Sequence, residues 1–174
     1  MPDLREQLGR CFQGRVCLMG IGSVDFGDDG FGVKLADAIA ERLIRSGHVA
    51  LAQNVIAAGT EPERMTGFVT GRGFDNLVFL DAVEFGGEPG SVIFLDANEI
   101  EDRFPQISTH KVSIGMLARC ITARGGTRVW LLGVQPGSLK PRYGLSAAVQ
   151  KAKDILEKML CDIWNDAGIM ATNA

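Results

Sequence analysis

Three carboxylates lie close together in a glycine-rich stretch near the N-terminus. They belong to Asp25, Asp28 and Asp29. The stretch, residues 20–32, separates a short apolar run from a helical pattern, and loops in this position commonly bind phosphate. Gly22 and Gly27 have the spacing of a phosphate loop, but Asp28 and Asp29 stand where Lys and Ser or Thr are required. The loop is therefore better suited to a cation or a basic partner than to phosphate.

Two further polar side chains can reach the same edge of a sheet. Asp81 directly follows an apolar strand predicted over residues 76–80, and His110 precedes a helix predicted over residues 112–124. The carboxyl ends of parallel strands lie at one edge, where α/β proteins have their active crevice. Asp29, Asp81 and His110 can therefore converge there as two carboxylates and one imidazole. Such a set can hold a metal ion with positions left open for water or substrate.

Each of these side chains also has a purely structural interpretation. One of the adjacent pair Asp28 and Asp29 can cap the first helix, and we assign that role to Asp28 and the ligand role to Asp29. Asp81 can bind loop amides at its strand end, and His110 can bond to backbone at a helix start. Asp29 and Asp81 can alternatively act on each other as acid and base. The nearby His110 favours the cation site.

Alternating strand and helix patterns predict the architecture. Strands are expected over residues 15–20, 49–57, 76–80 and 128–134, with residues 91–95 as an antiparallel edge strand in a hairpin. Helices are expected over residues 31–46, 112–124 and 146–163, and after Thr60, the candidate N-cap, with Pro62 in the first turn. This order predicts a three-layer α/β/α sandwich with a twisted, mostly parallel five-stranded sheet and one antiparallel edge strand.

The composition is that of an ordinary soluble globular domain. The chain has 174 residues, of which 46% are hydrophobic and 22% charged, with a net charge of −3. We expect one domain over residues 1–174, with a loose tail over residues 166–174. The absence of a basic cluster disfavours nucleic-acid binding. No apolar run is long enough for membrane insertion, and the N-terminus lacks a secretory pattern, so we expect a cytoplasmic protein.

Other catalytic classes lack their sequence signatures. There is no Gly-x-Ser-x-Gly elbow and no His-Glu-x-x-His pair. Cys17, Cys120 and Cys161 lie in apolar patterns, which predicts buried, reduced thiols; Cys120 is expected to pack in the core rather than act as a nucleophile. His48 follows Gly47 after the first helix, and we interpret it as a solvated C-terminal cap.

Six short motifs occur in order along most of the chain. They are Gly-x-Gly-x5-Asp-Asp-Gly-x-Gly from Gly20, Gly59-Thr60-x-Pro62-Glu63, Leu77-Val78-Phe79-Leu80-Asp81-Ala82, Pro89-Gly90, Ser108-Thr109-His110 and Leu132-Gly133-Val134-Gln135-Pro136. Together they resemble the nickel–iron hydrogenase maturation proteases, most closely the hydrogenase 3 branch that serves formate hydrogenlyase-type enzymes. Ser23 departs from the Asn that is usual in this family, which leaves the positioning of the loop, or the choice of substrate, open.

The resemblance implies an endopeptidase that removes the C-terminal extension of a hydrogenase large-subunit precursor after nickel insertion. The metal-contacting and catalytic residues it implies are Asp29, Asp81 and His110. Nickel would be carried by the precursor, and no organic cofactor is implied. The metal could act catalytically, or it could serve only for recognition while a carboxylate acts as general base.

Two other functions stay open at this stage. Ser23 is compatible with a module that binds the nickel-loaded precursor without cutting it. A metallohydrolase acting on a small molecule could use the same crevice. The sequence does not indicate an oligomeric state.

Overall fold

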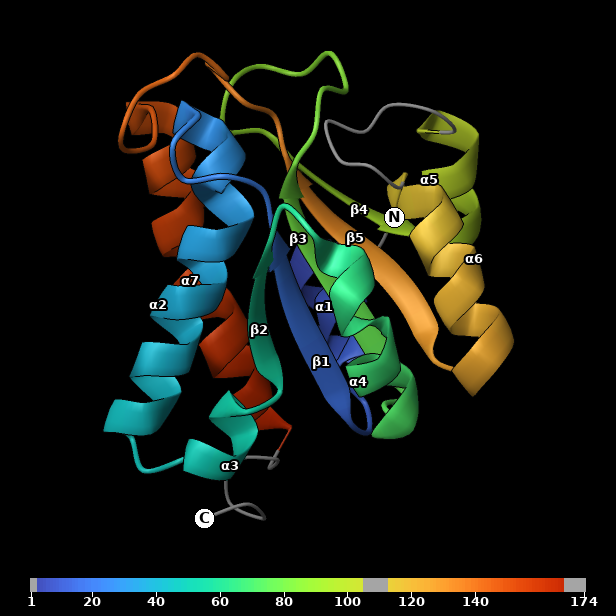
Figure 1. The fold of residues 1–174 in the computed structure, drawn as a ribbon. Helices are drawn as coiled ribbons and strands as arrows, with labels where there is room; N and C mark the ends of the chain where they lie inside the picture. Colours follow the sequence, from blue (N-terminus) through green and yellow to red (C-terminus); the bar gives the residue numbers. More distant parts are fainter. Residues whose placement is uncertain (1–2, 105–112, 168–174) are drawn as a thin grey trace.

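A computed structural model of the protein describes residues 3–104 and 113–167, which form an open α/β/α sandwich around a five-stranded sheet (Figure 1). The strand order is β2-β1-β3-β5-β4. Four strands are parallel: β1 (Val16–Ile21), β2 (Val55–Gly59), β3 (Asn76–Ala82) and β5 (Arg128–Val134). Strand β4 (Val92–Asp96) is antiparallel and lies at one edge. The predicted fold class is confirmed.

Helices cover both faces of the sheet. One face carries α1 (Leu4–Cys11), α2 (Phe31–Arg45), the short α3 (Val49–Ala52) and α7 (Ala147–Asp166). The other face carries α4 (Thr66–Gly71), α5 (Ala97–Arg103) and α6 (Ile114–Gly125). Two 3₁₀ turns, η1 (Gly27–Gly30) and η2 (Pro62–Met65), follow β1 and β2. Helix α7 begins within one residue of its predicted start and ends three residues beyond its predicted end.

Alternating side chains of each central strand enter two separate cores. In β3, Val78 and Leu80 pack with the core that contains α2 and α7. Leu77 and Phe79, on the opposite face, pack with the core that contains α4, α5 and α6. A strand buried on both faces has no polar positions to alternate with, so it is encoded as a continuous apolar run. This burial explains why β1, β3 and β5 could be predicted within about two residues.

Three local predictions are wrong. The strand expected over residues 49–57 begins only at Val55, because Val49–Ala52 forms the helix α3. Strand β4 does not form a hairpin with β3, since β3 is already paired on both sides by β1 and β5 and leaves no free edge. Thr60 caps no helix: the 3₁₀ turn that begins at Pro62 follows Glu61, which provides no side-chain cap either.

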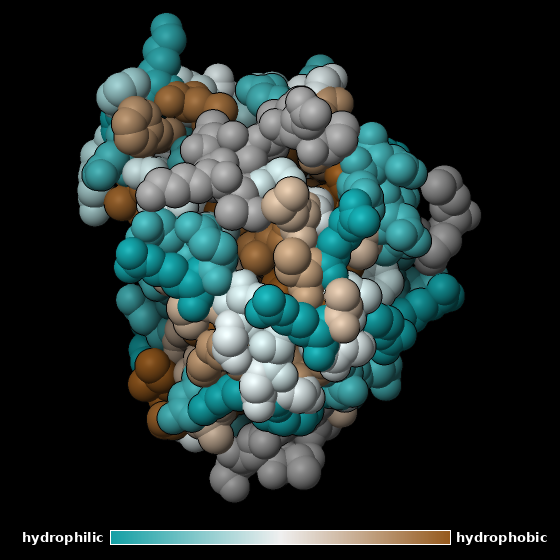
Figure 2. All heavy atoms as spheres, turned by 45° about the vertical axis from the view of Figure 1, so that its right-hand side comes forward, coloured by the Kyte–Doolittle hydropathy of each residue, from teal (hydrophilic) through white to brown (hydrophobic). Residues whose placement is uncertain are grey.

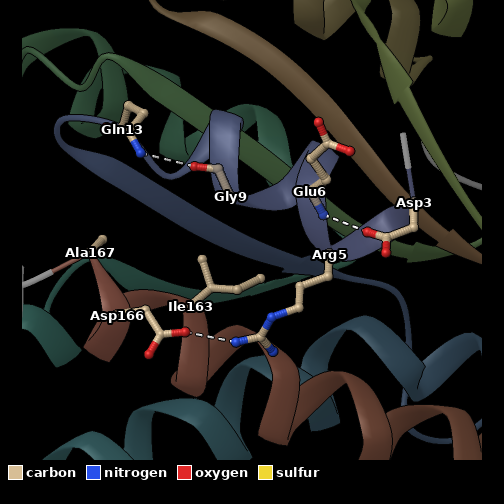
Figure 3. A pocket seen from close by; sticks show the side chains of 8 residues that line it. All are labelled: Asp3, Arg5, Glu6, Gly9, Gln13, Ile163, Asp166 and Ala167. Atoms are coloured by element: carbon tan, nitrogen blue, oxygen red, sulfur yellow. Dashed lines mark hydrogen bonds and ion pairs between the residues drawn. The ribbon is translucent and has the colours of Figure 1, made fainter. Parts of the chain in front are cut away.

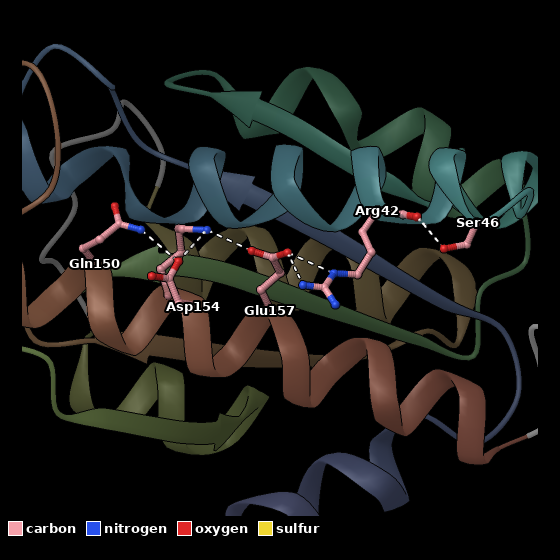
Figure 4. Close-up of polar contacts among 6 residues, drawn as sticks. Arg42, Ser46, Gln150, Asp154 and Glu157 are labelled. Carbon is pink, nitrogen blue, oxygen red and sulfur yellow. Dashed lines mark hydrogen bonds and ion pairs between the residues drawn. The ribbon is translucent and has the colours of Figure 1, made fainter.

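Polar contacts join α2 to α7 on the outer layer (Figure 4). Arg42 Nε donates to Glu157 Oε1 at 3.0 Å, and Lys153 Nζ donates to Glu157 Oε2 at 3.0 Å. Burial raises the pKa of Glu157, but the hydrogen bonds and charges of Lys153 and Arg42 outweigh it and hold that pKa below its usual value. Gln150 and Asp154 add a bond along α7 at 2.9 Å. These contacts fix the position of α7 relative to α2.

A pocket of about 440 Å³ lies between α1 and the end of α7 (Figure 3). Arg5 and Asp166 form an ion pair there at 2.7 Å, and both side chains are largely exposed, so the pair contributes little to stability.

The face of the molecule drawn in Figure 2 carries several small hydrophobic areas (brown), which are separated by hydrophilic residues (teal). Within residues 3–104 and 113–167, no helix is long and apolar enough to cross a membrane.

Candidate active site

The strand order creates a topological switch point between β1 and β3. Strand β1 is followed by α2 on one face, whereas β3 is followed by the edge strand β4 and then by α5 and α6 on the other face. The two connections diverge at the carboxyl ends of these neighbouring strands, which is where ligands bind in open α/β sheets. Asp29 lies in the turn after β1, and Asp81 is the second-last residue of β3. The sheet therefore brings both predicted acids to one crevice edge.

The glycines of the first loop serve close packing. A Cβ on Gly32 would overlap the carbonyl oxygen of Leu80, and one on Gly20 would overlap the carbonyl oxygen of Gly32. These contacts bring the first turn of α2 directly against β1 and β3. Gly22 has φ of +117°, and a Cβ there would overlap the backbone of Asp29. The glycine pattern that resembles a phosphate loop is therefore explained by the folding of the loop upon itself.

A backbone amide orients the carboxylate of Asp29. Its Oδ2 accepts a hydrogen bond from the backbone N–H of Ser23 at 2.7 Å, and the residue is half-buried. Any residue other than proline can supply this donor. The presence of Ser23 in place of Asn therefore leaves this contact of the loop intact.

Asp81 is a buried carboxyl group, only 3% exposed. Burial is the main cause that raises its pKa well above the usual value, and the negative charge of Asp29 raises it further. A hydrogen bond from the N–H of Ala82 to Asp81 Oδ1, at 2.8 Å, acts in the opposite direction. Asp29 and Asp81 therefore lie near enough to repel each other. Two like charges in one partly desolvated site favour a proton or a cation between them.

His110 lies outside the described residues, so the expected meeting of Asp29, Asp81 and His110 stays a prediction. Among residues 3–104 and 113–167, no three His, Cys, Asp or Glu side chains gather into a group that could hold a metal ion. The structure thus places two of the three predicted ligands side by side at the switch point. It does not test the third.

Asp28 has a structural role, as predicted, but with different partners. Its fully buried carboxylate accepts hydrogen bonds from the N–H groups of Gly137 and Ser138 at 2.8 and 3.0 Å. It also accepts from the N–H and hydroxyl of Ser146 at 2.6 and 2.8 Å. Burial raises the pKa of Asp28, but these hydrogen bonds outweigh it and lower the pKa below its usual value. Asp28 therefore ties the site loop to the N-cap residue of α7 instead of capping α2.

Gln135 fixes the loop that follows Asp81. Its Oε1 accepts from the N–H groups of Phe85 and Gly87 at 2.9 and 3.2 Å, and its Nε2 donates to Glu84 at 2.6 Å. Sequence reasoning assigned no such role to Gln135. The available signal was an amide directly after an apolar strand, at the same sheet edge as Asp81.

Two minor predictions need correction. Cys120 is exposed, because the buried face of α6 is formed by residues such as Leu117 and Ile121. Cys17 and Cys161 are buried as expected. Burial raises the pKa of Cys17 to about 12 and that of Cys161 to about 11.

His48 does take part in a C-terminal cap: its backbone N–H donates to the carbonyl of Leu43 at 2.8 Å in a Schellman arrangement. Its ring Nδ1 is buried, so the side chain is not simply solvated.

The fold and the paired carboxylates define an α/β/α protein with two neighbouring acidic residues at its switch point. The family model described as hydrogenase maturation protease matches residues 33–163. The chain therefore belongs to the hydrogenase maturation protease family, a family of endopeptidases.

Individual relatives agree with this assignment over nearly the whole chain. The hydrogenase 2 maturation protease of Escherichia coli (strain K12) is 27% identical over 162 residues, which cover 90% of this chain and 94% of the relative. The crystal structure of a [NiFe] hydrogenase maturation protease from Thermococcus kodakarensis superposes with a TM-score of 0.74 at 28% identity, covering 91% of this chain and 99% of that one. The solution structure of an endopeptidase from Escherichia coli gives 0.69 at 25% identity, covering 87% and 91%.

Proposed function

We propose that the protein removes the C-terminal extension of a nickel–iron hydrogenase large-subunit precursor after nickel has been inserted. The observation that carries this proposal is the pairing of Asp29 and Asp81 at the switch point of a chain that belongs to the maturation protease family. The sequence motifs favour a formate hydrogenlyase-type hydrogenase, of the hydrogenase 3 kind, as the source of the precursor.

The nickel of the precursor would be recognised by Asp29, Asp81 and His110. A cation between two carboxylates relieves their electrostatic repulsion, so a nickel-loaded precursor would bind more tightly than a precursor without nickel. The N–H of Ser23 already orients Asp29, which reduces the cost of ordering this ligand. His110 joins this set on the strength of the motif resemblance.

The same residues would carry the peptide hydrolysis. Docking of the nickel at the carboxylates would place the scissile peptide beside Asp29 and Asp81, since the metal and the extension belong to one polypeptide. A carboxylate could then take a proton from the attacking water, and nickel could polarise the scissile carbonyl. Which of these two contributions dominates is a question for the kinetics of single variants.

The test uses a large-subunit precursor prepared with and without nickel. After incubation with the purified protein, mass spectrometry of the large subunit should show loss of the extension only in the nickel-loaded sample. A stable complex without loss of mass would instead indicate a binding module, and indifference to both precursors would indicate a small-molecule enzyme. A fully active His110→Ala variant would exclude His110 from the proposed ligand set.

A further inference from the structure

A second surface is joined to the site loop by backbone hydrogen bonds. Phe26 and Arg142 form an isolated parallel bridge. The N–H of Gly27 donates to the carbonyl of Arg142 at 3.0 Å, and the N–H of Arg142 donates to the carbonyl of Asp25 at 3.0 Å. Figure 1 shows the orange segment between β5 and α7 passing beside the blue loop that precedes α2. Residues 138–143 therefore extend the loop that carries Asp29.

This extension is held in one arrangement. Asp28 forms two hydrogen bonds with Ser138 of the extension. The backbone N–H of Asp28 donates to the carbonyl of Ser138 at 3.0 Å, and the carboxylate of Asp28 accepts from the N–H of Ser138. Gly27 allows the close approach: it has φ of +59°, and a Cβ there would lie 2.7 Å from the carbonyl oxygen of Ser138. A surface fixed in advance loses little conformational entropy when a partner binds.

Two aromatic rings are exposed where this extension meets the loop that carries Asp29. The Tyr143 side chain is 82% exposed and Phe26 is 47% exposed. Lys34 Nζ lies 5.0 Å from the centre of the Tyr143 ring, on the first turn of α2. Single exposed apolar residues are normal, but rings and cations grouped beside a crevice are typical of protein-binding surfaces, where Tyr, Phe and Arg are enriched.

Two cations on this extension, Lys140 and Arg142, form no ion pair with another residue of the described ranges. Both side chains are exposed. Other surface arginines, such as Arg5 and Arg119, do form ion pairs. A surface with three cations, Lys34, Lys140 and Arg142, and one exposed acidic residue, Asp25, thus adjoins the loop that carries Asp29. Its complement is a polypeptide segment that is acidic and partly apolar.

We propose that Phe26, Lys34, Lys140, Arg142 and Tyr143 form a docking strip for an acidic, partly apolar segment of the substrate precursor. This inference rests on the proposed function, because it takes the precursor as the occupant. Residues 138–142, which carry Lys140 and Arg142 of the strip, lie against residues 25–28, immediately before Asp29 in the chain, so a segment bound there delivers the adjoining polypeptide to Asp29 and Asp81. The strip would thus contribute to binding, while Asp29 and Asp81 act on metal and peptide.

The experiment measures KM and kcat for removal of the extension from nickel-loaded precursor. The variants are Phe26→Ala with Tyr143→Ala, and separately Lys140→Glu with Arg142→Glu. Each pair should raise KM about tenfold or more while kcat stays within about twofold, because the lost contacts bind substrate and transition state alike. The control pair, Ile155→Ala with Lys158→Glu on the exposed face of α7, should leave both constants unchanged.

Salt dependence gives a second measurement. For the unaltered protein KM should rise as ionic strength is increased from about 0.05 to 0.5 M, and the Lys140→Glu, Arg142→Glu pair, which repels an acidic segment, should lose or reverse this dependence. An unchanged KM in both variant pairs, with the unaltered protein active, would overturn the docking strip alone. The variant pairs could instead lower the molar mass measured by light scattering and leave KM unchanged. That result would overturn the docking strip too, because a second copy of the chain would then be its occupant.

The proposed function fails separately, when the unaltered protein does not shorten the nickel-loaded precursor. In that case the affinity of the intact complex, measured by interferometry, tests the strip directly. Weaker binding by both variant pairs than by the control pair supports the strip, and equal binding by all of them refutes it.

Discussion

The carboxylates of Asp29, in the turn η1 after β1, and Asp81, in the neighbouring strand β3, lie close enough for the charge of Asp29 to raise the pKa of Asp81. Because Asp81 is also buried, its ionised form destabilises the folded state. Residues placed for function in this way commonly reduce stability. The pair therefore makes a prediction about folding that is independent of any substrate.

Asp81→Asn should stabilise the folded protein at pH 7, because the amide removes a buried charge that the folded state disfavours. The folded pKa lies above the ordinary value of 3.8, so the contribution of Asp81 to stability is lost as the pH rises from that value through the folded pKa. The advantage of the variant should therefore grow with pH. Urea unfolding between pH 4.5 and 8 measures it, and a variant less stable than the unaltered protein at pH 8 would contradict the assignment.

Asp28→Ala should destabilise the protein by about 3 kcal/mol or more, because it leaves buried donors of Gly137, Ser138 and Ser146 without their acceptor. For a domain of this size that corresponds to a fall in Tm of roughly 6–12 °C. Asp25→Ala, three residues earlier and exposed, is the matched control and should change Tm by less than about 2 °C. Equal melting of both variants in calorimetry would show that the buried carboxylate does not hold segment 137–146.

Gly32→Ala should lower stability and activity together. The added Cβ would overlap the carbonyl oxygens of Leu80 and Ile21, and backbone atoms cannot move aside without displacing α2. We expect a loss of about 2–4 kcal/mol, as for other overpacked positions. Gly67→Ala in α4 is the control, since its Cβ would meet nothing within 4 Å and alanine favours helix. Thermal unfolding of both variants tests this prediction. A Gly32→Ala protein as stable as Gly67→Ala would contradict the close contact of Gly32 with the backbone of Leu80 and Ile21.

The parts of the fold that the sequence could predict are those whose burial leaves a local pattern. Strands β1, β3 and β5 are continuous apolar runs because both their faces are covered. Residues 49–52 are also apolar, but a short apolar run is compatible with a helix or a strand, and here it is helical. The partner of β4 depends on which strand has a free edge, and no local pattern records that.

The candidate site follows the same division. Asp29 and Asp81 could be placed because Asp29 lies in the loop after one recognisable strand and Asp81 lies at the end of another, and the edge rule for parallel sheets joins them. The partners of Asp28 could not be foreseen, since Ser146 lies 118 residues away in the chain. Residues 138–143 were equally hidden, because their attachment to the first loop depends mainly on backbone hydrogen bonds, which any sequence can form.

Glu157→Gln should destabilise the protein by about 1–2 kcal/mol at pH 7. Its side chain is only 14% exposed and pairs with Lys153 and Arg42, although the half-exposed Arg42 is partly screened by solvent. The folded pKa lies below the ordinary value of 4.5, so this stabilisation is complete above that value and disappears as the pH falls through the folded pKa. The difference between the two proteins in denaturant curves should thus be full at pH 7 and shrink progressively as the pH is lowered below 4.5. A difference that persists in acid would contradict the ionic origin.

The rate at which nickel-loaded precursor loses its extension tests the central claim most directly. Asp29→Asn and Asp81→Asn keep the size of each side chain and remove its charge; each should reduce the rate at least about 100-fold while circular dichroism stays unchanged. Asp162→Asn, on the exposed face of α7 far along the chain, should retain the full rate. If either Asp29→Asn or Asp81→Asn cut as fast as Asp162→Asn, the two carboxylates at the switch point would not be the working centre of this protein.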